Sequence, residues 1–162
     1  MSALIRSFCL AILGGCASET GSGSTSTSSV IIGGCKDDGT GYLDWHSSTI
    51  APNIVMGPQG GQHVYVSVRA TSDFYVKNAR ITVDGLDLDT GDIVKPGAFE
   101  FTRSFTPEGS GLGVVGLTSF VKEPCKIKGH RVRMHVHVED LVGLTGDDEA
   151  IITPSWNGFC AN

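Results

Sequence analysis

The stretch RVRMHVHVE, residues 131–139, decides the fold class of this chain. Its apolar residues are Val132, Met134, Val136 and Val138, and they alternate with arginine, histidine and glutamate. Side chains two residues apart on a strand point to the same face of a sheet. The alternation therefore predicts a strand with one buried face and one polar face.

The same alternation recurs in other segments of the chain. They are HVYVSVR at 63–69, RITVDG at 80–85, FEFTRSF at 99–105 and EAIITPSW at 149–156. Glycine, proline and aspartate, which favour turns, separate these segments. Strands with one apolar face bury it against a second layer. We predict an all-β fold, an antiparallel two-sheet immunoglobulin-like sandwich of about seven strands.

The predicted strand order resembles an immunoglobulin or fibronectin type III sandwich over roughly residues 40–157. The resemblance is one of architecture, because the Cys, Trp, Cys pattern of antibody domains is missing. Trp45 lies before the first clear strand, and Trp156 lies at the end of the last one. The sandwich domain is assigned to residues 30–162, where alternating runs replace a polar stretch.

Composition limits the function classes. The chain has 162 residues, of which 40% are hydrophobic and 18% are charged. This length accommodates one ordinary domain with short appendages. The formal net charge is -5, whereas binding to nucleic acid needs a cationic surface, so we expect no nucleic-acid partner.

The amino terminus is typical of a secreted protein. Residues 1–15 carry one positive charge, Arg6, followed by an apolar run that is too short to span a bilayer. We interpret them as a signal peptide. The sequence Leu13, Gly14, Gly15, Cys16 resembles the bacterial lipobox. The resemblance implies that Cys16 is lipidated on its thiol, becomes the first residue after cleavage, and is then acylated on its amino group with a fatty acid such as palmitate.

An alternative is that Cys16 merely lies near an ordinary signal cleavage site. The composition of residues 16–29 favours the lipid anchor, because they are mainly Ser, Thr and Gly, which is the composition expected of a flexible tether. Bacterial lipoproteins kept at the inner membrane commonly carry Asp after the lipidated Cys, whereas this chain has Ala17. The resemblance therefore implies an outer-membrane lipoprotein that faces the periplasm or the cell surface.

Two histidines offer the clearest candidate for site chemistry. His135 and His137 share the polar face of one strand, and this spacing lets two imidazoles reach one metal ion. The HVH sequence also resembles that of copper-zinc superoxide dismutases, but this chain has no histidine after His137. Arg131 and Arg133 lie on the same face, where they would repel a cation. His63 is expected in the opposite sheet.

Other motifs support ordinary turns and strands. GLGVVG at 111–116 matches a dinucleotide fingerprint in letters, but no helix pattern follows it. The sequence shows no set of residues for nucleophilic catalysis. Cys125 and His130 are a possible nucleophile and base, but no third group that would orient the histidine accompanies them. A calcium site remains an alternative to a turn for the aspartates of DGLDLDTGD, which are Asp84, Asp87, Asp89 and Asp92.

Cysteine pairing follows from the proposed processing. Removal of Cys9 and lipidation of Cys16 leave Cys35, Cys125 and Cys160 in an oxidising compartment. A hairpin turning at VGLTG, residues 142–146, would pair residues whose numbers sum to roughly 288. This register brings Cys125 and Cys160 to one end of the hairpin and predicts a disulfide between them. The rival is a bond from Cys35, which we expect ahead of the first strand, to Cys160.

These observations predict a lipid-anchored envelope protein. Its sandwich would have a structural or binding role and would recognise a protein or a glycan. We expect no enzyme activity and no cofactor on this interpretation. The alternative is a metal-binding or metalloenzyme sandwich that uses His135 and His137.

Overall fold

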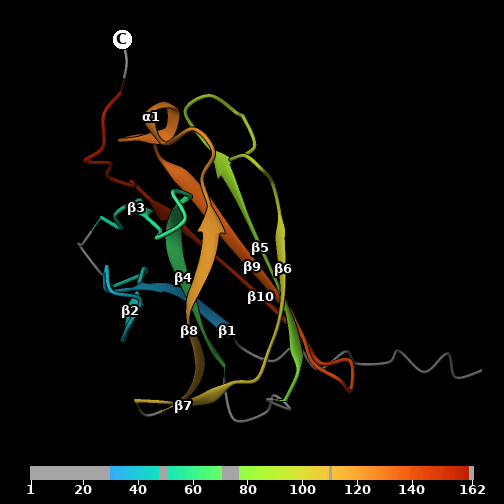
Figure 1. The fold of residues 1–162 in the computed structure, drawn as a ribbon. Coiled ribbons are helices and arrows are strands. Elements are labelled where there is room, and N and C mark those ends of the chain that lie inside the picture. The colour runs from blue at the N-terminus through green and yellow to red at the C-terminus, as the bar shows by residue number, and fades with distance from the viewer. Residues whose placement is uncertain (1–29, 48–50, 71–76, 110, 161–162) are drawn as a thin grey trace, which may run out of the picture.

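The computed structural model describes residues 30–47, 51–70, 77–109 and 111–160. The predicted signal peptide at 1–15, the predicted tether at 16–29 and the predicted lipidation site Cys16 lie outside the described residues. The described residues form two antiparallel sheets that pack face to face (Figure 1). Within these ranges there is one short helix, α1 (Pro124–Ile127), which precedes one of the central strands.

The smaller sheet contains the stretch that predicted the fold. Its order is β10 (Thr145–Ile152), β9 (Val132–Glu139), β5 (Ala79–Asp87) and β6 (Phe99–Arg103). The larger sheet has the order β2 (Tyr42–Asp44), β1 (Val30–Cys35), β4 (Gln62–Ala70), β8 (Gly111–Phe120) and β7 (Thr106–Glu108), with β3 (Val55–Met56) paired to β4.

The all-β sandwich prediction is confirmed. Among the described residues, the strands with at least five residues are β1, β4, β5, β6, β8, β9 and β10, which makes seven. The order β1, β4, β8 in one sheet and β10, β9, β5 in the other matches the A, B, E and G, F, C strands of an immunoglobulin sandwich. The additional strands β2, β3 and β7 have three residues or fewer, which is too short for a periodic pattern.

The core lies between the two sheets, and β9 and β4 each contribute an alternating row of side chains to it. The alternating residues of β9 are at most 4% exposed, and those of β4 are at most 2% exposed: Val132, Met134, Val136 and Val138 on β9, and Val64, Val66 and Val68 on β4. Burial of these side chains is the main force that holds the sheets together, at about 25 cal/mol per Å² of apolar surface.

The outer face of β4 is more buried than the alternation predicts. Ser67 is fully buried, and its hydroxyl accepts a hydrogen bond from the backbone N–H of Gly116 at 3.3 Å. The backbone of Gly39 crosses this face, and a Cβ on Gly116 would lie 2.9 Å from the carbonyl oxygen of Gly39. Gly116 also has a φ of +76°. The GLGVVG segment thus belongs to β8, and its last glycine permits a close backbone approach.

The predicted hairpin register is wrong by four residues. Glu139 pairs with Thr145, so paired numbers in β9 and β10 sum to 284. The turn is earlier than expected because the buried carboxylate of Asp140 accepts hydrogen bonds from the backbone N–H groups of Val142 and Leu144, both at 2.9 Å. Thr145 therefore begins β10, although it was predicted to lie in the turn.

The predicted cysteine pairing is confirmed. Cys125 in α1 and Cys160 in the carboxyl-terminal segment form a disulfide. The residue numbers of the two cysteines sum to 285, close to the sum of 284 that holds for paired residues of β9 and β10. The two cysteines therefore lie nearly opposite each other beyond the open end of the hairpin. Cys35 is a free cysteine, but it ends β1 and does not precede the first strand. The sequence missed β1 because Gly33 and Gly34 interrupt its pattern.

Candidate functional site

The two predicted histidines lie on the outer face of the smaller sheet. His135 and His137 are neighbours along β9 on the face away from the core, and their side chains are 31% and 37% exposed. Their neighbours across the sheet include two aspartates. Asp84 of β5 is directly opposite His135, and Asp147 of β10 is directly opposite His137.

These aspartates contact the imidazoles. The carboxylate of Asp84 lies 3.0 Å from Nδ1 of His135. Oδ1 of Asp147 lies 3.3 Å from Nε2 of His135 and 2.7 Å from Nδ1 of His137. One carboxylate oxygen of Asp147 therefore faces a nitrogen of each ring. Asp147 belongs to β10, whose pairing register with β9 differs from the predicted one.

The two arginines expected to repel a cation are paired with carboxylates. Arg131 contacts Asp89 at 2.9 Å, and Arg133 lies 3.6 Å from Glu149. Their positive charges are thus partly compensated. His63 lies in β4, in the opposite sheet as predicted, where it packs against Tyr65 and burial lowers the pKa of its ring.

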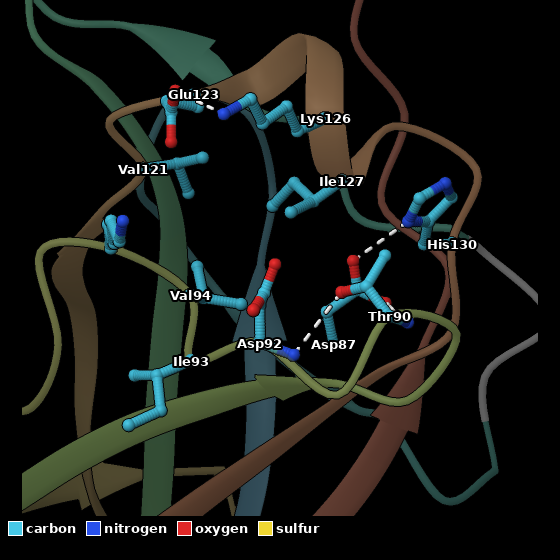
Figure 2. A pocket seen from close by; sticks show the side chains of 11 residues that line it. Asp87, Thr90, Asp92, Ile93, Val94, Val121, Glu123, Lys126, Ile127 and His130 are labelled. Carbon is cyan, nitrogen blue, oxygen red and sulfur yellow. Dashed lines mark hydrogen bonds and ion pairs between the residues drawn. The ribbon is translucent and has the colours of Figure 1, made fainter.

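A second candidate is a hollow of about 290 Å³ at the α1 end of the sandwich, which we call the pole pocket. It lies between the connection from β5 to β6, the segment after β8, and α1 (Figure 2). Its lining residues are Asp87, Thr90, Asp92, Ile93, Val94, Lys95, Val121, Glu123, Lys126, Ile127 and His130.

A buried carboxylate orders one side of the pole pocket. Asp87 is 3% exposed and lies 2.8 Å from Nδ1 of His130 (Figure 2). Burial alone would raise the pKa of Asp87, but hydrogen bonds from His130 and from the backbone N–H groups of Asp89 and Thr90 outweigh burial and lower it. The same contact raises the pKa of His130. The pair fixes the loop that borders the pocket.

The four aspartates considered for calcium do not gather. Among the described residues, the only group of at least three His, Cys, Asp or Glu side chains with donor atoms within 4.8 Å of one another is Asp87, Asp89 and His130. Asp84 instead contacts His135 on the sheet face. Both carboxylate oxygens of Asp89 already accept hydrogen bonds from Arg131, which opposes a cation there.

The disulfide fixes the other side of the pole pocket. Cys125 is covalently tied to the carboxyl-terminal segment, and the next residues of α1, Lys126 and Ile127, line the hollow. Because Cys125 is oxidised, its thiol is not available as a nucleophile beside His130. Sequence reasoning missed this pocket, because its lining comes from segments that no spacing pattern connects.

Comparison with family models, with curated proteins and with solved structures finds no match for this chain. No helix within the described parts of the chain is long and apolar enough to cross a bilayer. The geometry of the two candidate sites therefore carries the functional argument.

Proposed function

We propose that this chain is an outer-membrane lipoprotein whose β-sandwich is a binding module, with the pole pocket as its ligand site. Support for the anchor comes from the lipobox-like sequence ending at Cys16 and from the Ser, Thr and Gly tether after it. Two or more acyl chains hold a protein stably on a membrane. The tether then lets the sandwich reach partners in the envelope.

The pole pocket is the observation that supports binding. Its apolar floor consists of Val94, Val121 and Ile127, and its rim carries charged groups of both signs. Glu123 and Lys126 on the rim form an ion pair at 2.7 Å. Ligand sites typically combine an apolar surface with a few polar groups that fix orientation, and their volumes start near 300 Å³.

A sugar unit of an envelope glycan matches this lining best. Sugar hydroxyls donate hydrogen bonds to carboxylates such as Asp92 and accept them from lysines such as Lys126. The C–H face of a sugar ring suits the apolar floor. A protein side chain is the other ligand of this size, so the test includes it.

Local bonding supports a pocket that is formed before the ligand arrives. The disulfide holds α1, and the Asp87 to His130 contact holds the opposite loop. A preformed site loses less conformational entropy on binding.

The test is retention of the purified protein on immobilised envelope polysaccharide and on protease-treated envelope. We expect the double substitution Asp92→Ala and Lys126→Ala to reduce glycan binding by about tenfold, which corresponds to about 1.4 kcal/mol. Arg80→Ala, on the far face of the smaller sheet, is the matched control and should bind normally. Retention only by protease-sensitive material, or equal retention of the pocket variant, would contradict a glycan site.

A further inference from the structure

The end of the sandwich opposite the pole pocket carries two exposed apolar side chains at its tip. Leu141 and Val142 lie in the turn between β9 and β10, and they are 61% and 71% exposed. The turn holds them outward, because the carboxylate of Asp140 accepts hydrogen bonds from the backbone N–H groups of Val142 and Leu144. Neighbouring apolar side chains that a fold presents to solvent commonly mark a contact surface.

Position in the fold distinguishes this tip from other exposed apolar side chains, such as Ile93 and Phe159. The backbone N–H of Ile32 donates to the carboxylate of Asp148 at 2.8 Å, so β1 lies beside the first half of β10. β10 begins directly after the turn. The first residue of β1, Val30, is therefore at the same end of the sandwich as the turn, whereas α1 is at the other end (Figure 1).

We propose that this end of the sandwich rests on the bilayer that holds the anchor, with Leu141 and Val142 inserted at the lipid headgroups. The assignment rests on the lipid anchor at Cys16 in the proposed function, but not on glycan binding. Cys16 lies 14 positions before Val30. A Ser- and Gly-rich segment of this length has an average span of about 20 Å. The eight residues of β9 extend over about 26 Å. The end that carries Val30 therefore stays nearer to the bilayer than the opposite end.

The anchor makes a small apolar contact sufficient. Even a single myristoyl chain binds a free protein to a membrane only marginally, so two side chains cannot supply attachment. In an anchored chain the same contact is intramolecular, and a short flexible linker gives it an effective concentration of about millimolar. The turn therefore sets the orientation of a domain that is already attached.

Basic side chains at this end suit lipid phosphates. Lys77 and Arg80 lie at the start of β5, and Arg103 ends β6. Arg80 has Glu139 at 3.7 Å, whereas no carboxylate of the described residues lies within 4.0 Å of Lys77 or Arg103. The carboxylate of Asp140 is buried inside the turn. Anionic headgroups attract lysine and arginine that come close to the membrane surface.

This orientation directs the pole pocket away from the bilayer. The pocket lies at the α1 end of the sandwich, across the length of the strands from the turn. A partner in the envelope can then reach the pocket without competing with lipid.

The experiment places the fluorophore NBD, whose emission depends on polarity, at either end of the anchored full chain in vesicles of phosphatidylethanolamine and phosphatidylglycerol. Ser104→Cys labels the turn end, where the backbone N–H of Asn78 donates to the exposed Ser104. Thr90→Cys is the matched control at the pocket end. Cys35→Ser in both variants leaves one site for the dye when Cys16 carries lipid. On vesicles, the emission at position 104 should gain intensity and shift to shorter wavelength, and the emission at position 90 should stay as in buffer.

The apolar tip is tested by substitution in the labelled chain. Leu141→Ser with Val142→Ser should abolish the shift at position 104. The variant should remain on the vesicles and unfold thermally like the wild type, because both side chains are exposed. Absence of a shift at position 104, an equal shift at position 90, or a shift that survives the double serine substitution would each overturn the proposal.

A second form of the experiment separates this contact from the anchor. The chain from position 16 onward, with Cys16→Ser and an amino-terminal hexahistidine tag, is held on vesicles that contain a nickel-chelating lipid. The attachment point is then the same, but no acyl chain is needed. A shift at position 104 on these vesicles supports the contact, whereas absence of lipid on the native Cys16 would refute the anchor of the proposed function alone.

Discussion

Replacing both Cys125 and Cys160 by serine should destabilise the sandwich strongly. The bond joins residues 35 apart in sequence. In the chain-entropy model, a loop of this length lowers the entropy of the unfolded chain by about 13 cal/mol/K, or about 4 kcal/mol at 25 °C. The native state of the variant keeps part of the tail in place, because Ser155 exchanges backbone hydrogen bonds with Ile54 and Pro52 at 2.8 and 3.0 Å.

Only the last few residues of the tail are therefore released. We expect a loss of about 3 to 4 kcal/mol in the free energy of unfolding, and a fall in Tm of about 10 °C for a domain of this size. Urea unfolding followed by tryptophan fluorescence measures the loss, because Trp45 and Trp156 are both buried.

The free cysteine provides the matched control. Cys35→Ser leaves the disulfide intact and should cost about 1 kcal/mol or less, as for most single substitutions without a new cavity. A loss below about 1 kcal/mol in the double serine variant would show that the tail hydrogen bonds, and not the covalent link, order this end of the sandwich.

Three further predictions concern separate parts of the chain. Cys16→Ser should abolish labelling by palmitate and release the protein from the detergent fraction; equal labelling would refute the anchor. Asp140→Ala should cost about 2 kcal/mol in urea unfolding, because two backbone N–H groups lose a charged acceptor, whereas Asp140→Asn should cost less. The contact with Asp87 raises the pKa of His130 above 6.5. The protonated ring therefore stabilises the fold below pH 6.5 and loses this effect as pH rises through the raised pKa, so His130→Asn should cost more stability at about pH 5.5 than at about pH 9.

The fold was predictable because apolar and more polar residues alternate in the sequences of β9, β4 and β5. The period of two in β9 and β4 reports which side chains face the core, and it does so without knowledge of the partner strand. The buried outer face of β4 was not predictable in this way. Its cover comes from the backbone around Gly39, which has no periodic signal.

The neighbours of His135 and His137 on the outer face of the smaller sheet were predictable only in part. The spacing of His135 and His137 is local, so it can be recognised in the sequence, but their neighbours depend on register. The predicted sum of roughly 288 would place Ile151 opposite His137, whereas the observed register places Asp147 there. A shift by four residues keeps every side chain on its face and still changes its neighbours. The register depends on Asp140, whose side chain fixes the turn and whose role was not recognised from the sequence.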